Sequence, residues 1–403
     1  MAFFKKGEFN LLWPFYLETF ISKLFWIFPA FWIIQLQNYL SLTQIGLLFS
    51  VLAIASFLFE IPTGAIADIY SRKFSVVLGY ILSGLTLLSL LFFKEFYTLL
   101  IIFSLYGIFQ TFISGAKEAW VADNLKFNKK SKLIQDYFIK NGSFVMFSLF
   151  FSGFIGAFFV KFFGIDIIWP VTGFSLLISG LLLLFIKEEK VTTQEKKYLK
   201  EIYTQSKSSI KYSLKHKIIF TLIISLFFFS FWGIFGGDLV WQPFLKDLGF
   251  PVYAFGFLFS GLTLAGVFTP FLAQPILKIL KKENRFLALS MFSIIIVLTL
   301  VLFVNHWVLG VVLYFILFLL MTIHHPIRQA YFQKFIPSNM RATITSFEGM
   351  VIALAIAISA PLAGFMADVF GPRVSIFVSS IVLIPAIFLY LKIKEKPNHL
   401  SSL

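Results

Sequence analysis

The chain consists mainly of long apolar stretches, each able to cross a lipid bilayer as a helix. One crossing needs about 20 mostly apolar residues, and 59% of the 403 residues are apolar. Only 13% are charged, which is about half of the usual share in soluble domains. This pattern predicts an all-α polytopic membrane protein and excludes a soluble enzyme, a disordered chain and a coiled coil. Cysteine is absent, so disulfides and thiolate metal sites are excluded, and we expect neither a metal site nor a cofactor.

The apolar stretches predict twelve transmembrane helices in two groups of six. The first group comprises Leu11–Leu36, Thr43–Ala67, Phe74–Phe93, Tyr97–Gly115, Gly142–Val160 and Ile167–Ile186. The second group comprises Ile218–Leu245, Val252–Leu277, Leu287–Val304, Val308–Ile323, Ala342–Ala367 and Val374–Leu391.

A polar segment rich in lysine separates the two groups. We therefore predict an N-terminal six-helix bundle over residues 1–186, a basic cytoplasmic linker over 187–217 and a C-terminal six-helix bundle over 218–403. Apolar residues recur at helical spacing within the linker. Two interpretations stay open: an amphipathic helix on the anionic inner leaflet, or a charged connection without regular structure.

Basic residues are distributed very unequally over the two sides of this topology. Of the 34 Lys and Arg residues, 29 fall on one side and Lys23 lies within the first span; the other four are Lys94, Lys161, Lys246 and Arg373. Cytoplasmic segments carry the excess of Lys and Arg, so both termini of this multi-pass protein are predicted to be cytoplasmic, in the cell membrane. The net charge of +15 thus reflects topology and lipid contact, and we expect no nucleic-acid partner.

The two groups of spans show internal similarity. Gly46-Leu-Leu-Phe-Ser50 recurs as Gly256-Phe-Leu-Phe-Ser260, at an offset of 210 residues. Ala119-Trp120 recurs as Ala330-Tyr331, at an offset of 211 residues. Together with the six-plus-six arrangement, these matches indicate a duplicated six-helix unit. An even number of helices inserts both copies in the same orientation, which gives parallel repeats.

A short motif lies between the second and third predicted spans. It reads Pro62-Thr-Gly64-Ala-Ile-Ala-Asp68-Ile-Tyr-Ser-Arg72-Lys73. It resembles the signature loop of the major facilitator superfamily, although Ser71 replaces the usual glycine and Ile69 a frequent basic residue. Ser114–Asp123 is similar to a stretch found in bacterial permeases of the drug-efflux-like branches. The resemblance covers essentially the whole chain and implies the fold of this superfamily and a transport function.

The resemblance also implies roles for the residues of this loop. Asp68 would lie near the N-terminal end of the eleventh helix, where the helix dipole stabilises an anion. Arg72 would pair with Asp123. Breaking such a contact biases the inward- and outward-facing states, so the predicted conformational latch comprises Gly64, Asp68, Arg72 and Asp123.

Ionisable residues inside the spans are functional candidates, because each costs at least about 2.5 kcal/mol on insertion scales. At 1.5 Å per residue, Glu18, Glu60 and Glu348 lie at a common depth of roughly 10 Å from the cytoplasmic side, and Lys23 is close to the midplane. Asp238 is predicted near the outer mouth, and the resemblance places Gln110 on the wall of the transport cavity. The candidates for proton coupling or substrate binding are therefore Glu18, Lys23, Glu60, Gln110, Asp238 and Glu348. The alternative for Glu18 or Glu60 is a structural contact, for example with Lys23 or Lys117.

The expected function is secondary active transport by alternating access, as proton-coupled efflux of a small organic solute by an antiporter. The chain has no phosphate-binding loop for ATP and no HExxH or GxGD motif, so we expect neither an ATP-driven pump nor an intramembrane enzyme. Alternatives are an importer of an anionic metabolite, in which Lys23 binds the anion, and a lipid flippase or sensor on the same scaffold. Expected partners are a small-molecule substrate, protons and membrane lipids, and the resemblance implies a monomer.

Overall fold

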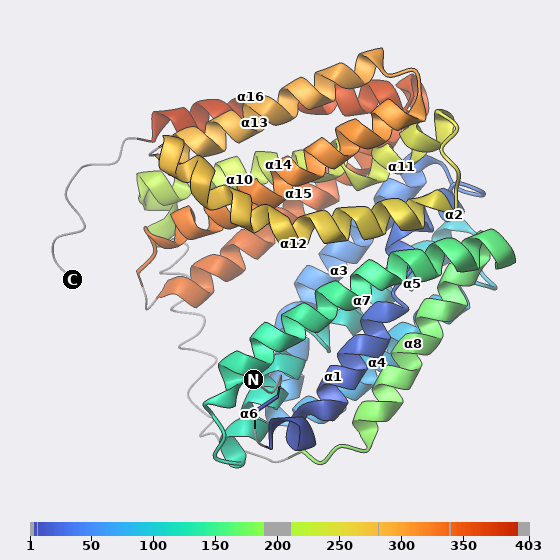
Figure 1. Ribbon diagram of the computed structural model, residues 1–403, viewed down its shortest axis with the longest axis vertical. Coiled ribbons are helices and arrows are strands. Elements are labelled where there is room, and N and C mark those ends of the chain that lie inside the picture. The colour runs from blue at the N-terminus through green and yellow to red at the C-terminus, as the bar shows by residue number, and fades with distance from the viewer. Residues whose placement is uncertain (1–3, 6, 189–210, 281, 338–339, 394–403) are drawn as a thin grey trace. The chain divides into compact units, whose positions relative to one another are not determined.

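The computed structural model describes residues 4–5, 7–188, 211–280, 282–337 and 340–393 (Figure 1). Its regular elements in these ranges are helical. Up to residue 188 they are α1 (Glu8–Leu24), η1 (Phe28–Ala30), α2 (Trp32–Leu36), α3 (Leu42–Ile69), α4 (Arg72–Ser89), α5 (Phe96–Thr111), α6 (Ala116–Phe127), α7 (Leu133–Phe163), η2 (Ile165–Ile167) and α8 (Ile168–Leu184). They continue with α10 (Lys217–Phe235), α11 (Asp238–Asp247), α12 (Ala254–Leu280), α13 (Glu283–Leu300), η3 (Val301–Phe303), α14 (Trp307–Gln333), α15 (Arg341–Phe370) and α16 (Pro372–Lys392).

Ten helical segments of the described chain are long and apolar enough to cross a membrane. The multi-pass, all-helical character predicted from the sequence is therefore confirmed. The other two predicted spans, Phe74–Phe93 and Val252–Leu277, coincide with α4 and α12, which are not among these ten. The total of twelve spans and the cytoplasmic placement of both termini stay predictions.

Two predicted span ends are wrong, because the helices continue past basic residues. The fourth span was expected to end at Gly115, but α6 follows α5 after a short break, and the two form one membrane-length segment, Phe96–Phe127. Likewise α14 runs to Gln333, well beyond Ile323. The added turns contain Lys117 and Arg328, which are 8% and 2% exposed. Their charges are paired inside the protein, so they need not mark the water boundary.

The chain folds into two compact units. Unit 1 comprises Met1–Gln194 and Gly249–Val267, and unit 2 comprises Glu195–Leu248 and Phe268–Leu403. The first half of α12 is therefore grouped with unit 1, whereas the sequence placed all of it in the C-terminal bundle. Most of the predicted linker, residues 189–210, lies outside the described residues.

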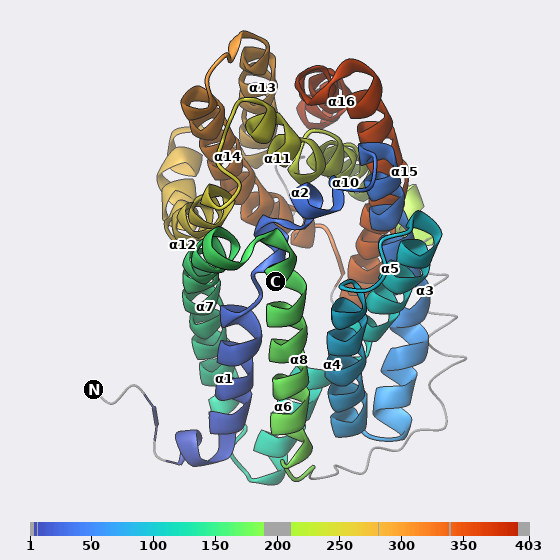
Figure 2. The same ribbon diagram turned by 90° about the vertical axis from the view of Figure 1, so that its right-hand side faces the viewer.

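Unit 1 is held together by closely packed helix pairs. Helix α4 packs on α8, α3 on α5, and α1 on both α7 and α8; Figures 1 and 2 show α1 beside α8. The contact of α4 with α8 is close because Gly84 and Gly173 face each other. A Cβ atom on Gly84 would lie 2.7 Å from the carbonyl oxygen of Gly173. Small residues take this role in membranes because they let two helix backbones approach.

The repeat sequence Gly256–Ser260 also forms a close helix contact. A Cβ atom on Gly256 would lie 2.3 Å from the carbonyl oxygen of Gly153 on α7. The hydroxyl of Ser260 donates a hydrogen bond of 2.6 Å to the carbonyl oxygen of Phe150. This direct backbone contact explains why the first half of α12 belongs to unit 1.

In unit 2, α10 packs against α15 and α16, and α13 packs against α14 and α16.

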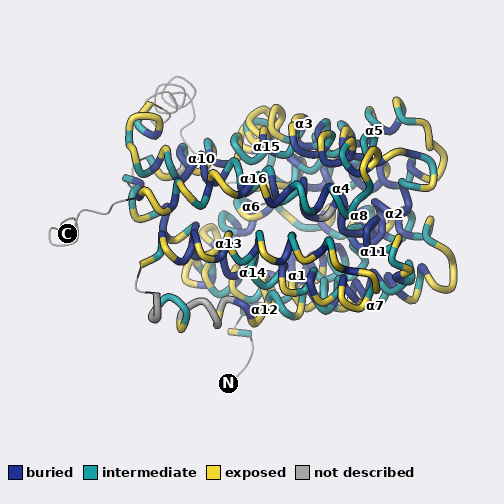
Figure 3. Tube along the Cα trace, turned by 90° about the horizontal axis from the view of Figure 1, so that it is seen from above, coloured by how far each residue is buried: buried dark blue, intermediate teal, exposed yellow. Residues whose placement is uncertain are grey.

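Buried and exposed residues alternate along the helices of both units (Figure 3). Many exposed side chains are large and apolar, for example Phe92 (80%), Phe303 (71%) and Phe388 (59%). Apolar surface of this extent suits contact with lipid tails, since an aqueous surface exposes much smaller apolar patches.

The glycine contact of α7 with α12 predicts a difference between two glycine substitutions on the same helix. Gly153→Ala should lower the free energy of unfolding by about 1–3 kcal/mol, because the added methyl group overpacks the contact. Gly142 has no atom within 4 Å of an added Cβ, so Gly142→Ala should be neutral or raise this free energy by up to about 1 kcal/mol. Reversible unfolding by denaturant in detergent measures the free energy of unfolding of each variant. Equal effects of the two substitutions would contradict the close packing of α7 on α12.

Candidate functional site

Glu18 is the centre of a buried polar network in unit 1. Its side chain is fully buried, and its carboxylate forms an ion pair with Lys117 of α6. The same carboxylate accepts hydrogen bonds from the hydroxyl groups of Tyr80 on α4 and Ser22 on α1, the latter at 3.1 Å. Lys117 also donates to the hydroxyl of Thr19 at 2.8 Å. The charge of Glu18 is thus compensated by one cation and several donors.

Local structure brings these side chains together. Glu18 and Ser22 are four residues apart and therefore lie on the same face of α1. Lys117 is in the first turn of α6, two residues after Gly115. The backbone of Gly115 has φ of 71°, a conformation that glycine adopts without strain, and this break separates α6 from α5. Thr19 extends the network to α7 by donating to the side-chain oxygen of Asn141 at 2.9 Å.

A second buried network lies in unit 2. Arg328 of α14 forms an ion pair of 2.8 Å with Glu348 of α15, and the two residues are 2% and 4% exposed. One turn earlier on α14, His324 is fully buried, with Nδ1 2.7 Å from the hydroxyl of Ser290 on α13. The ring of His324 stacks on Phe229 of α10, with centroids 4.5 Å apart. Four helices of this unit thus meet around buried polar groups.

The two buried cations occupy equivalent positions of the repeat predicted from the sequence. The offset of 211 residues that relates Ala119-Trp120 to Ala330-Tyr331 also relates Lys117 to Arg328. Both cations are among the 29 basic residues assigned from the sequence to the cytoplasmic side, and Lys117 was expected only as an alternative partner of Glu18 or Glu60. The repeat offset was the signal that would have identified Arg328. Tyr80 had no such signal, because a tyrosine in an apolar span gives no indication of its hydrogen-bond partner.

The other predicted residues of unit 1 have separate surroundings. Glu60 is exposed and accepts a hydrogen bond of 3.3 Å from Ser114, so it does not share the network of Glu18. Gln110 donates to the hydroxyl of Ser83 at 3.0 Å. The ammonium group of Lys23 lies 4.1 Å from the ring centroid of Trp26. In the described part of the chain Lys23 has no carboxylate partner.

Glu8 is a buried acid that was not among the residues predicted from the sequence. It is fully buried in the first turn of α1, and Lys140 of α7 donates to both of its carboxylate oxygens, at 2.7 and 2.6 Å. The hydroxyl of Tyr16 donates to it at 3.0 Å. The predicted first span begins at Leu11 and therefore does not include Glu8.

Arg72 connects the signature loop to α6. It forms the expected ion pair with Asp123 and donates a hydrogen bond of 2.9 Å to the carbonyl oxygen of Ala119. Its second nitrogen is 3.3 Å from Asp68, whose side chain is 63% exposed. Gly64 lies within α3, with no atom within 4 Å of an added Cβ.

Ser71 is well suited to the position where this loop usually has glycine. Its backbone is extended, with φ of −175°, which any residue adopts. The hydroxyl oxygen of Ser71 accepts a hydrogen bond of 2.9 Å from the backbone N–H of Phe74. The substitution therefore provides an N-cap for α4.

The side chain of Asp238 lies outside the described residues, although its backbone begins α11. Among the described side chains, no group of three or more His, Asp or Glu residues is arranged to hold a metal ion. The candidate residues among the described side chains therefore interact through ion pairs and hydrogen bonds.

The network of Glu18 predicts strong coupling between Glu18 and Lys117. Lys117→Gln should lower the free energy of unfolding by about 3–5 kcal/mol, because it leaves a buried carboxylate without its cation. Glu18→Gln combined with Lys117→Gln should cost less than the sum of the two single changes, since no unpaired charge remains. Unfolding curves of the unchanged protein, the two single variants and the double variant measure the coupling energy. Effects on the free energy of unfolding that add within about 0.5 kcal/mol would show that the ion pair contributes nothing to stability.

Comparisons with known proteins agree with this architecture. The profile of the Major Facilitator Superfamily matches residues 15–360. The chain is 30% identical over 380 residues to the uncharacterized MFS-type transporter YxaM of Bacillus subtilis, covering 90% of this chain and 91% of that protein. It is 29% identical over 189 residues to the multi-drug resistance efflux pump PmrA of Streptococcus pneumoniae, covering 46% of this chain and 43% of the pump.

The fold also matches that of solved transporters. The nucleoside transporter NupG superposes with a TM-score of 0.77 at 13% identity, over 96% of this chain and 100% of NupG. The profile match, the full-length similarity to YxaM and the shared fold lead to one conclusion. The chain belongs to the major facilitator superfamily of membrane transporters and is not an enzyme.

Proposed function

We propose that this transporter moves a small organic solute out of the cell by alternating access, in exchange for protons. The observation that carries the proposal is the fully buried carboxylate of Glu18, paired with Lys117 and accepting a hydrogen bond from Tyr80. Buried ionisable groups within membrane spans are characteristic of substrate and proton pathways. Glu348 with Arg328 is the corresponding candidate of unit 2.

Charge balance explains how protonation of Glu18 would couple to conformation. With Glu18 ionised, the pair with Lys117 has no net charge. A proton on Glu18 removes the counter-charge and leaves a buried ammonium group, which is costly. Protonation therefore favours any conformation in which Lys117 is hydrated or has a new partner. A ligand that prefers one of two conformations shifts their populations in this way.

Efflux as the direction is supported by the partial similarity to the pneumococcal multi-drug resistance efflux pump. The many aromatic side chains suit an apolar or aromatic solute, since the chain contains 56 Phe residues. We further propose a monomer in the cell membrane, with both termini in the cytoplasm and twelve spans in two six-helix bundles.

Uptake of an anionic metabolite is the second candidate. It is favoured by Lys23, whose ammonium group lies over Trp26 and has no carboxylate partner in the described part of the chain. An organic anion would supply the missing counter-charge, while the indole ring offers a surface for an apolar group. In this case Lys23 is the substrate-binding residue. Gln110 is a second polar side chain in the same unit.

The proton-coupling proposal predicts different results for two buried acids on α1. In proteoliposomes with a pH gradient, Glu18→Gln should abolish accumulation driven by protons but keep solute exchange at equal pH. Glu8→Gln is the matched control, because Glu8 is also buried and ion-paired, ten positions earlier on the same helix. It should keep proton-driven transport after correction for the amount of folded protein.

Three outcomes separate the proposals. Proton-driven transport that survives Glu18→Gln would refute the role of Glu18. If no solute of a broad panel moves protons, the coupling is refuted as a whole. Inward movement of an anion that Lys23→Ala abolishes, while Lys94→Ala leaves it unchanged, would establish the importer.

The exposed carboxylate of Asp68 is proposed as the cytoplasmic latch, held in position by Arg72 and Asp123. The chain has no cysteine, so a single cysteine replacing the exposed Ser114 can report the opening of this side. An anion at the N-terminal end of a helix, as proposed for Asp68 at the eleventh helix, is stabilised by about 0.3–2 kcal/mol. Asp68→Asn should therefore change the rate at which maleimide labels this cysteine roughly two- to thirtyfold. Asp136→Asn, which removes a salt bridge to Lys5, is the control, and equal rates in both variants would refute the latch.

A further inference from the structure

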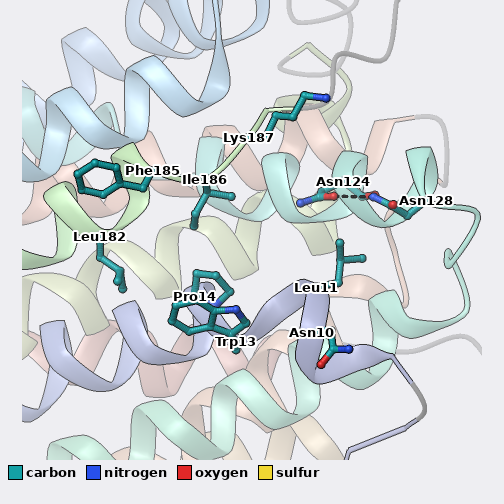
Figure 4. Close-up of a pocket in the computed structure, with 10 residues that line it drawn as sticks. All are labelled: Asn10, Leu11, Trp13, Pro14, Asn124, Asn128, Leu182, Phe185, Ile186 and Lys187. Atoms are coloured by element: carbon teal, nitrogen blue, oxygen red, sulfur yellow. Dashed lines mark hydrogen bonds between the residues drawn. The ribbon is translucent and has the colours of Figure 1, made fainter.

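A cavity of about 490 Å³ lies within unit 1, beside the ends of three helices (Figure 4). Its walls come from the first turns of α1, the last turn of α6 and the residues after α8. The lining residues are Asn10, Leu11, Trp13, Pro14, Asn124, Asn128, Leu182, Phe185, Ile186 and Lys187. The volume is within the range of sites for small organic ligands. None of these residues belongs to the network of Glu18.

The lining has a polar part and an apolar part. Three carboxamides and the ammonium group of Lys187 form the polar part, and aliphatic and aromatic side chains form the remainder. Two of the apolar residues leave large surfaces uncovered, since Phe185 is 85% exposed and Trp13 is 42% exposed. A ligand that matches this lining has a polar group at one end and an apolar body.

Asn124 directs a hydrogen-bond donor towards the cavity. Its side-chain oxygen accepts a bond of 2.8 Å from the amide of Asn128, and its amide nitrogen lies on the opposite side (Figure 4). Among the described residues this nitrogen has no acceptor, although Asn124 is only 4% exposed. This nitrogen is not among the buried side-chain atoms that lack a partner, so it is accessible and can donate to a ligand that presents acceptor oxygens.

The depth of the cavity corresponds to the lipid headgroups. Trp13 is five residues from the start of α1 at Glu8, which is roughly 8 Å along the helix. The polar layer on each side of the hydrocarbon core is roughly 5–8 Å thick, and aromatic residues concentrate at this level. The same end of unit 1 carries Lys126, Lys129 and Lys132, so its charge is complementary to anionic headgroups.

We propose that this cavity binds an anionic phospholipid of the leaflet that faces the basic ends of the helices. The phosphate oxygens accept hydrogen bonds from Asn124 and Asn10 and lie near the ammonium group of Lys187. An acyl chain covers Trp13 and Phe185. The lipid would hold the ends of α1, α6 and α8 together, at the opposite end of α6 from the break at Gly115. The site does not depend on the identity of the transported solute.

Binding is tested on the full chain purified in detergent, by native mass spectrometry with added phosphatidylglycerol or phosphatidylcholine. We expect phosphatidylglycerol to be retained about tenfold more strongly. Lys187→Gln should reduce this retention about fivefold, the effect of roughly one basic residue. The matched control is Lys94→Gln, which removes an exposed lysine outside the cavity and outside this basic end of unit 1 and should leave retention unchanged. Asn10→Leu alters an exposed lining residue, so it tests the polar part without affecting the core.

Each alternative result would overturn the proposal. Equal retention of both lipids would show that the headgroup charge is not recognised. Retention that is unchanged in Lys187→Gln and Asn10→Leu would place the lipid elsewhere. Soluble glycerol phosphate that binds as tightly as phosphatidylglycerol would show a phosphate site without a lipid. Loss of lipid preference only in variants with a lowered melting temperature would indicate a general effect on folding.

Discussion

The cost of placing charge in a bilayer is the constraint on which the rest of this structure depends. A transporter needs ionisable groups inside the membrane, and each must be compensated there. In this chain the compensation is local. Glu8 pairs with Lys140, Glu18 with Lys117, and Glu348 with Arg328, each pair within one unit. Because the members of each pair come from different helices, the same contacts that neutralise the charges also determine which helix faces meet.

Helix packing provides the second determinant, and it uses small residues where charges are absent. Gly84 with Gly173 brings α4 against α8, and Gly153 with Gly256 brings α7 against α12. Without a hydrophobic force between helices in lipid, close backbone approach supplies van der Waals energy instead. The ion pairs of Glu18 and Glu348 join α1 to α6 and α15 to α14, whereas the glycine contacts join α4 to α8 and α7 to α12.

The class of fold could be predicted from the sequence, because the length of the apolar stretches and the loop motif are both local features of the chain. It predicted side-chain partners less well, because partners depend on which helix faces meet. Arg72 with Asp123 was expected from the resemblance, but Arg328 was counted as a loop residue and Tyr80 was not considered. The depth argument placed Glu18 and Glu60 together, whereas one is buried and the other exposed. Depth alone does not specify the direction in which a side chain points from its helix.

In the duplication predicted from the sequence, the cations correspond more closely than the anions. Lys117 and Arg328 are related by the repeat offset, but their carboxylates come from α1 in unit 1 and from α15 in unit 2. The two pairs therefore connect non-equivalent helices, and protonation of each carboxylate would release a different helix contact. A symmetric pair of sites would respond to protons in the same way in both units. Under the proposed proton coupling, the observed asymmetry would let the two units divide coupling and substrate binding between them.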